Sequence, residues 1–89
     1  MRRPLEERAS RRHRSTRRFT KLAMALGKQI RRLRQERDWT LEEAADRADL
    51  DWKHLQKVEA GKINVTLVTL DRLACAFKVP VSELFRGDK

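Results

Sequence analysis

The sequence has few of the residues that build disulfide-rich or membrane-spanning proteins. Its 89 residues include one cysteine, two prolines, three glycines and no tyrosine. Cys75 has no second cysteine to pair with in the chain, and such sparse cysteine usage favours a reducing cytoplasm over secretion. No apolar run approaches the roughly 20 residues that a transmembrane helix needs, and the N-terminus lacks the apolar core of a signal peptide. We therefore expect a single cytoplasmic domain without a membrane partner.

Positive charge is abundant and unevenly distributed. The chain has 22 Lys and Arg against 13 Asp and Glu, which gives a net charge of +9 and a pI of about 10.8. Residues 1–21 hold nine of the cations and only two Glu, whereas residues 22–89 are nearly neutral. This balance favours a polyanionic partner, nucleic acid first and an anionic membrane surface second.

Residues 1–21 form a predicted basic arm. Between Ala9 and Arg18 there is no large apolar residue, so this segment has no face to bury. Pro4 followed by Leu-Glu-Glu is a favourable helix start, and the arm is expected to be flexible or partly helical. Two alternatives remain open, a solubilising leader and an arm that contacts nucleic-acid phosphates. The arginines expected to make such contacts are Arg11, Arg12, Arg14, Arg17 and Arg18.

A first helix is expected over about residues 21–37, at the start of a helical domain spanning residues 22–86. Gly27 costs this helix about 1 kcal/mol relative to alanine, so its first turn is expected to fray. Trp39 follows as the residue that closes the corner to the second helix. The buried stripe recurs at helical spacing and consists of Leu22, Leu26, Ile30 and Leu33.

Residues 40–61 have the layout of a helix-turn-helix. Thr40 and Glu43 form a capping box for a second helix over residues 41–48. This helix is rich in alanine, which allows another helix to approach its backbone closely. A short turn then leads to a third helix over residues 52–60.

The turn and the end of the third helix also have clear signals. Leu50 is expected to be buried between Asp49 and Asp51, and Asp51 is the predicted N-cap of the third helix. Gly61 ends that helix as a left-handed cap. On a helical wheel Leu55 and Val58 centre the buried face, with Trp52 and His54 on its flanks. The residues expected to face outward are Lys53, Gln56 and Lys57.

The rest of the chain predicts two more helices. Thr66 caps a fourth helix, and Pro80 opens a short fifth helix over residues 81–85, in which Leu84 and Phe85 cover apolar surface. A tail of residues 87–89 follows. The buried stripe of the fourth helix is Leu67, Leu70, Leu73, Ala74 and Phe77, which excludes Cys75.

From about residue 26 to residue 85 the sequence resembles the Cro/C1-type, or XRE-type, helix-turn-helix domain of bacterial and phage repressors. The resemblance implies a compact five-helix, all-α fold and an ion pair between Arg34 and Glu59. It also implies that Lys53 and Lys57 occupy positions that commonly reach base edges. The chain length and the Glu-Leu-Phe ending are similar to the small controller proteins of restriction-modification systems, which are homodimers. The resemblance rests on Gly27, Ile30, Arg31, Leu33, Arg34, Trp39, Thr40, Glu43, Ala45, Leu55, Val58, Glu59, Gly61, Leu70, Leu73, Ala74, Phe77, Val79, Val81, Glu83, Leu84 and Phe85.

Three residues near the expected DNA surface depart from the family pattern. Leu41 stands where the family usually has a phosphate-contacting glutamine, and Asp49 stands where the turn usually has glycine. Trp52 stands where a polar base-contacting residue is frequent. Its indole is expected either to touch a thymine methyl group or sugar, or to pack on the second helix.

These observations predict a sequence-specific regulator of transcription that binds double-stranded DNA as a homodimer, in the bacterial or phage-infected cytoplasm and on the nucleoid. No enzyme activity, cofactor or small-molecule ligand is expected, and the two histidines have no second metal ligand nearby. Two other classes remain open: an antitoxin-like or adaptor-like protein-interaction module, and a non-specific nucleic-acid binder driven by the arm. The expected base contacts are Trp52, Lys53, His54, Gln56 and Lys57, and the expected phosphate contacts outside the arm are Thr40, Lys62 and Asn64.

Overall fold

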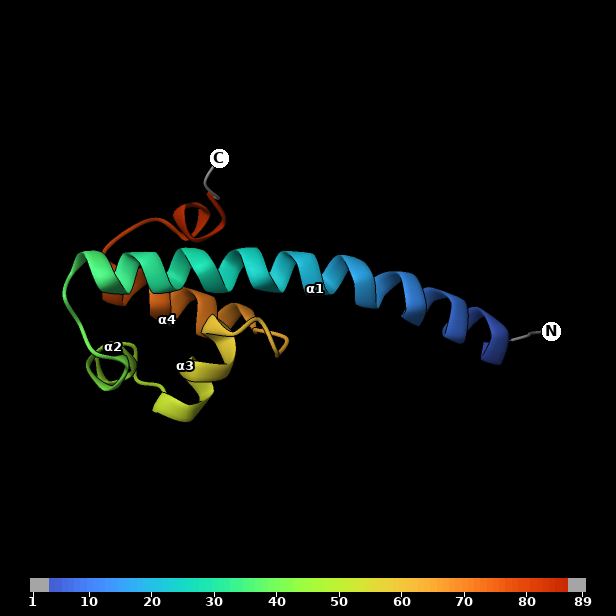
Figure 1. The fold of residues 1–89 in the computed structure, drawn as a ribbon, viewed down its shortest axis with the longest axis horizontal. Helices are drawn as coiled ribbons and strands as arrows, with labels where there is room; N and C mark the ends of the chain where they lie inside the picture. The colour runs from blue at the N-terminus through green and yellow to red at the C-terminus, as the bar shows by residue number, and fades with distance from the viewer. Residues whose placement is uncertain (1–3, 87–89) are drawn as a thin grey trace.

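The chain folds into four α-helices and one 3-10 helix, and the first helix is much longer than the others (Figure 1). The computed structural model describes the backbone of residues 4–86 and the side chains of residues 17–86, so the predicted tail lies outside the described residues. The predicted all-α architecture is confirmed, although the fifth helix is a 3-10 helix. The elements are α1 (Pro4–Glu36), α2 (Leu41–Arg47), α3 (Trp52–Glu59), α4 (Leu67–Phe77) and η1 (Val81–Phe85).

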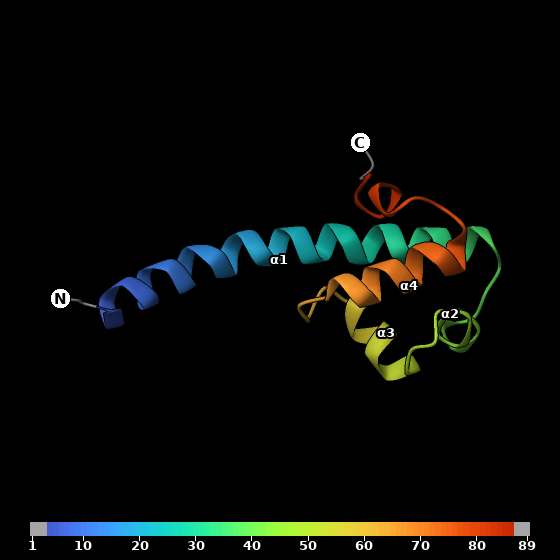
Figure 2. The same cartoon turned by 180° about the vertical axis from the view of Figure 1, so that it is seen from behind.

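Helix α1 begins at Pro4, far before the start expected near residue 21. Proline suits the first position of a helix, and no glycine or proline interrupts the sequence between Pro4 and Gly27. The first half of α1 extends away from the rest of the molecule (Figures 1 and 2). Because the helix is continuous through residues 21 and 22, the predicted arm joins the domain without any irregular backbone. Even this 33-residue helix, like the other helices in the described part of the chain, is not apolar enough to cross a membrane.

The other elements pack around the second half of α1. In both views α3 lies on one side of α1 and η1 lies on the opposite side, while α4 contacts η1 and α2 contacts α3. The buried side chains between these elements form an apolar core of Leu26, Ile30, Leu33, Ala44, Ala45, Ala48, Leu55, Val58, Leu70, Leu73, Ala74, Phe77 and Leu84.

Three residues predicted to be buried are exposed instead, and they are Leu22, Leu67 and Phe85. Leu67 is the first residue of α4 and Phe85 is the last of η1, so both lie at the ends of elements where the core stops. Leu22 lies on α1 just before the packed part of the helix, where Ala23 is buried in its place. The predicted helical periodicity is therefore confirmed. The core covers less of α1, α4 and η1 than the apolar pattern indicates.

Gly27 allows α1 to approach the end of α3 closely. A Cβ atom at Gly27 would lie 2.6 Å from the carbonyl oxygen of Val58 and closer still to that of Glu59. The expectation that α1 frays at this glycine is therefore wrong, because the backbone of α3 packs against it. Gly61, with a φ of 71°, similarly faces Met24 of α1, whose Cγ atom would lie 2.8 Å from a Cβ.

Trp39 closes the corner between α1 and α2, as predicted, and it also holds α4 there. Its ring stacks on Phe77, with centroids 5.7 Å apart and an interplanar angle of 15°. The guanidinium of Arg47 lies over the Trp39 ring, 4.4 Å from the ring centroid. Arg37 completes the corner, because its Nη2 atom donates to the carbonyl oxygen of Phe77 at 2.7 Å.

The turn between α2 and α3 has the predicted left-handed residue. Asp49 has a φ of 58°, which aspartate tolerates better than most residues. Leu50 is half-buried at the edge of the core rather than fully buried. Asp51 is the N-cap of α3 by its backbone conformation, but its side chain makes no capping hydrogen bond, contrary to the usual role of aspartate there.

Candidate nucleic-acid interface

Helix α3 separates a buried face from a charged exposed face. Leu55 and Val58 are fully buried against the core. The side chains at i, i+3 and i+4 on the other face, Lys53, Gln56 and Lys57, are exposed and lie together on the helix surface. Two cations and an amide are thus presented to solvent by a helix whose rotation is fixed by its apolar side.

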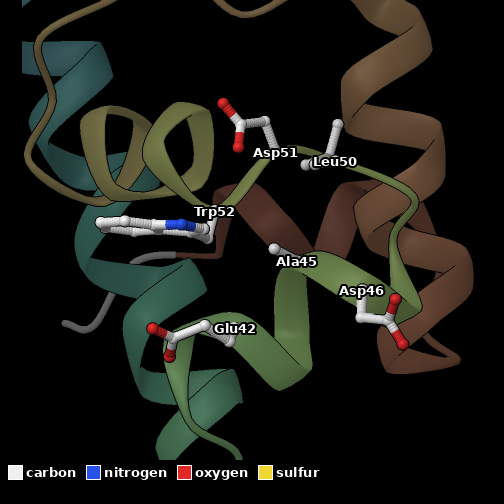
Figure 3. A pocket seen from close by; sticks show the side chains of 6 residues that line it. All are labelled: Glu42, Ala45, Asp46, Leu50, Asp51 and Trp52. Atoms are coloured by element: carbon white, nitrogen blue, oxygen red, sulfur yellow. The ribbon is translucent and has the colours of Figure 1, made fainter.

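Trp52 lies at the start of α3, beside α2. Its side chain remains 39% exposed, and it lines a surface hollow of about 220 Å³ (Figure 3). The Nζ atom of Lys53 lies 5.9 Å from the centroid of the Trp52 ring. The indole therefore borders α2 while keeping a surface available to a partner, and His54 on the other flank is half-buried. The hollow is lined by Glu42, Ala45, Asp46, Leu50, Asp51 and Trp52.

An ion pair fixes α3 against α1. Arg34 donates from Nε to Glu59 Oε2 at 2.7 Å and from Nη2 to Glu59 Oε1 at 2.9 Å, which is the pairing that the family resemblance implies. The hydrogen bond to Glu59 raises the pKa of Arg34, against the opposing effect of desolvation. Arg31 adds a longer contact to the same carboxylate at 3.4 Å. Because the Glu59 side chain is only 2% exposed, its charge depends on these arginines for compensation.

Thr40 caps α2 with the predicted capping box. The Glu43 amide donates to Thr40 Oγ1 at 3.0 Å, and the Thr40 amide donates to Glu43 Oε1 at 2.8 Å. The backbone amides of both residues are thus already bonded within the chain, and the hydroxyl of Thr40 is the group left to donate to a ligand. The neighbouring Leu41 packs against the core.

The loop between α3 and α4 presents two further polar side chains. Lys62 and Asn64 are both exposed in this loop. Thr66 ends it as the N-cap of α4, where its Oγ1 accepts a hydrogen bond from the Thr69 amide at 3.2 Å. The loop is held beside α1 by the contact between Gly61 and Met24.

The structure describes the side chains of two of the five arginines predicted to contact phosphates from the arm. Arg17 and Arg18 are exposed on α1. The side chains of Arg11, Arg12 and Arg14 lie outside the described residues, although their backbone belongs to α1.

Charge of opposite sign is concentrated on α1 and around the turn between α2 and α3. Residues 8–35 of α1 contain eleven Lys and Arg and no Asp or Glu. By contrast, four exposed acidic side chains surround the turn of the helix-turn-helix. They are Glu42, Asp46, Asp49 and Asp51. A polyanion is therefore attracted to α1 and α3 and repelled by the surface around the turn.

The described residues contain no cluster of three metal-ligating side chains, and Cys75 is exposed and unpaired with another cysteine. The sequence did not identify two side chains that hold α4 and η1 in place. Arg37 was not assigned a role, and Gln29 is buried although it is polar. The Nε2 atom of Gln29 donates to the Glu83 carbonyl oxygen at 2.8 Å, which fixes η1 on α1. A polar residue gives no periodicity signal, so only its partner in the fold identifies it.

A family model described as helix-turn-helix matches residues 30–84. Control protein C.MunI from a Mycoplasma species is 34% identical over 65 residues, which cover 72% of this chain and 88% of that protein. The HTH-type transcriptional regulator DdrOP3 from Deinococcus deserti is 36% identical over 64 residues, which cover 72% of this chain and half of that protein.

Two solved structures are also similar. The restriction-modification controller protein C.AhdI from Aeromonas hydrophila superposes with a TM-score of 0.69 at 33% identity, covering 71% of this chain and 96% of that one. A hypothetical transcription factor, NHTF, from Neisseria superposes with a TM-score of 0.71 at 27% identity, covering 74% of this chain and 76% of that one. This chain is thus similar to these proteins in both its sequence and its backbone arrangement.

Proposed function

The chain belongs to the Cro/C1-type (XRE) helix-turn-helix family, and on that basis we propose that it regulates transcription by binding a double-stranded DNA operator through helix α3. The observation that carries this proposal is the exposed set of Lys53, Gln56 and Lys57 on one side of α3. An α-helix of this kind fits the major groove of B-DNA, where base edges are distinguishable.

In the proposed complex each exposed side chain of α3 has a chemical role. Lys53 and Lys57 donate to guanine O6 and N7 or to phosphate oxygens, and Gln56 bonds an adenine edge or the backbone. Trp52 supplies apolar contact to a thymine methyl group or a sugar, and the half-buried His54 contributes at the flank. The Arg34–Glu59 pair acts indirectly, by fixing the angle of α3 relative to α1.

Phosphate contacts are proposed on either side of the groove. Thr40 at the start of α2 is one, and Lys62 and Asn64 in the loop after α3 are the others. Such contacts position the protein on the duplex without specifying its sequence. The arm adds electrostatic affinity for the same polyanion through its arginines, and which of them make contact is decided by how the arm is held.

The proposed assembly is a homodimer on an operator with dyad symmetry. One short recognition helix contacts few base pairs, and a two-fold axis places a second copy on a matching half-site. The surface available for this contact includes large apolar side chains that are exposed on α4 and η1, which touch each other. These side chains are Leu67, Val68, Val81 and Phe85. Burial between two copies removes them from water and stabilises the dimer.

The finer proposal is that the operator belongs to a restriction-modification system. It is supported by the match to C.MunI, a control protein, and to C.AhdI, a restriction-modification controller, over 88% and 96% of their lengths. The proposed place of action is the bacterial cytoplasm, on the nucleoid, and the proposed action is binding without catalysis or a small-molecule ligand.

One feature favours an alternative, a protein-interaction module that keeps this fold. The hollow beside Trp52 combines an exposed indole with Glu42, Asp46 and Asp51, which is an acidic and aromatic surface better suited to a basic protein than to DNA. The third alternative is non-specific nucleic-acid binding through the arm alone.

Selection of sites from a random duplex library tests the proposal. We expect the unmodified chain to enrich a palindromic sequence, and the double variant Lys53→Ala, Lys57→Ala to lose sequence preference. The matched control is Arg32→Ala, Arg86→Ala, which removes two exposed cations at the side of α1 that carries η1. This control should keep the preference. Equal affinity of the unmodified chain for all duplexes would overturn the proposal in favour of a non-specific binder, and no affinity would favour the interaction module.

A further inference from the structure

Helix α1 presents different faces to α3 and to η1. Met24, Gly27 and Arg31 meet the end of α3 and the loop after it, through the Gly61, Val58 and Glu59 contacts already described. On the opposite side, Gln29 binds the backbone of η1. Figures 1 and 2 agree that α3 and η1 lie on opposite sides of α1.

Because α1 is one unbroken helix, these faces continue into the extension that projects beyond the domain. Arg17 precedes Met24 by seven residues, which is within about 20° of two full turns, so it lies on the α3 side. Arg18 precedes Gln29 by eleven residues, which is within about 20° of three full turns, so it lies on the η1 side. The two adjacent arginines are thus separated by about 100° around the helix, with Arg17 toward α3 and Arg18 toward η1.

The positive surface on the α3 side is continuous with the proposed DNA-binding surface. The contact between Met24 and Gly61 brings the loop that carries Lys62 next to α1, one residue beyond Gly61. Arg17 lies about 10 Å farther along the helix axis than Met24, on the same face. Neither Arg17 nor Lys62 forms an ion pair with another described residue, so both charges are available to an anion.

We propose that the extension of α1 binds the DNA phosphate backbone as a helix, through the α3-side face alone, with Arg17 in contact and Arg18 pointing away. This proposal rests on the proposed function and refines it, because a flexible arm would use the two arginines interchangeably. A preformed helix also orders fewer side chains and less backbone on binding than a flexible arm does.

The salt dependence of binding tests this proposal in the full chain, with a labelled random-sequence duplex as the probe. Each phosphate contact contributes about 0.9 to the slope of log K against log salt concentration. We expect Arg17→Ala to reduce the magnitude of this negative slope by about that amount. Arg18→Ala, its matched control, should leave the slope unchanged. Both variants remove one charge and introduce a good helix former, which circular dichroism checks.

An insertion makes the test independent of any local property of the two positions. Two alanines inserted between Phe19 and Thr20 place Arg18 eleven residues before Gly27, within about 20° of three full turns and so on the α3 side. The same insertion places Arg17 fourteen residues before Gln29, within about 40° of four full turns and so toward the η1 side.

In this background Arg18→Ala should reduce the magnitude of the slope and Arg17→Ala should not. Equal losses from both arginines, or an unchanged pattern after the insertion, would overturn the helical contact while leaving the proposed function intact. Absence of duplex binding by the unmodified chain would overturn both.

Discussion

Arg34 of α1 donates two hydrogen bonds to the carboxylate of Glu59 at the end of α3, and it donates a third, from Nη1, to the carbonyl oxygen of Trp39 at 3.0 Å. The Arg34 side chain is 15% exposed and that of Glu59 is 2% exposed, whereas Arg31, the other partner of Glu59, is 54% exposed. The two arginines are therefore unequal partners of the same carboxylate.

This inequality predicts the effect of removing either arginine. Arg34→Ala leaves a buried carboxylate poorly compensated and should lower the free energy of unfolding by about 3 kcal/mol. Arg31→Ala removes a solvent-screened contact and should cost less than about 1 kcal/mol. Urea denaturation followed by circular dichroism measures both. Similar losses from the two variants would show that burial does not decide the strength of this pair.

The same pair should not respond to pH near neutrality through Arg34. Because the pKa of Arg34 is raised in the folded state, its stabilising effect is fully present below the unfolded pKa and is lost only as the pH rises through the folded value, in strong alkali. Urea midpoints of Arg34→Lys and of the unmodified chain should therefore differ by a constant amount between neutral and mildly alkaline pH. A difference that grows in that range would contradict the assignment.

Gly27→Ala separates helix propensity from packing. Propensity alone predicts that alanine stabilises a helix by about 1 kcal/mol. The added Cβ would overlap the backbone carbonyl groups of Val58 and Glu59, so we expect a loss of stability and a displaced α3. The control, Ala25→Gly at an exposed position of α1, should cost about 1 kcal/mol by propensity alone. A gain in stability for Gly27→Ala would mean that α3 does not lie this close to α1.

Two residues in the left-handed region offer stabilising changes. Lys78 caps α4 with a φ of 61°, and Asp49 has a φ of 58°. Lys78→Gly should raise the free energy of unfolding by about 1 kcal/mol, because glycine has no steric penalty there. Asp49→Gly should gain less, because aspartate tolerates this region. Thermal unfolding measures both, and a larger gain at Asp49 would contradict this ranking.

The two tryptophans allow the docking of α3 to be followed separately. In Trp39→Phe, Trp52 is the remaining indole, and its fluorescence should change on addition of a selected duplex because it lies at the exposed start of α3. In Trp52→Phe, the remaining Trp39 is stacked on Phe77 and should respond little. A response from Trp39 alone would place the DNA at the corner of α1 and α2 instead.

The exposed apolar residues of α4 and η1 make the proposed dimer testable. The double variant Val68→Lys, Phe85→Lys should weaken self-association at least about tenfold in sedimentation experiments, since it places two unpaired charges in a surface that dimerisation removes from water. Trp52→Lys is the control, because it replaces an exposed apolar side chain on the proposed DNA surface. It should leave the sedimenting mass unchanged. If only Trp52→Lys disrupts the dimer, the interface lies at α3.

Local signals in the sequence predict the shorter elements well. Thr40 with Glu43, Thr66 and Gly61 are caps whose chemistry acts within one turn. The bounds of α2 and α3 and the start of α4 agree with the predictions to within about a residue. The exposed set of α3 followed equally well from a helical wheel, because Leu55 and Val58 fix which side is buried.

Burial on α1 could not be predicted in the same way. Leu22 and Gln29 lie two turns apart on the same side of α1, yet the apolar residue is exposed and the polar one is buried. The position of η1 decides which of these two side chains is buried, because η1 packs over Gln29 and its Glu83 is 54 residues beyond Gln29 in the sequence. The same limit applies to Gly27, whose role depends on a backbone that arrives from α3. The length of α1 is hard to predict for a different reason: residues 9–18 have no apolar face, which favours a flexible segment, yet no glycine or proline interrupts the helix there.

The continuity of α1 has a consequence for the DNA rather than for the protein. A duplex that contacts both α3 and the extension meets two surfaces whose relative angle is set by a single helix, so the duplex has to adapt its own curvature to them. The energy of that curvature depends on the stiffness of the base-pair steps that flank the half-site. Flanking sequence can thus influence affinity at positions that no side chain of this protein touches.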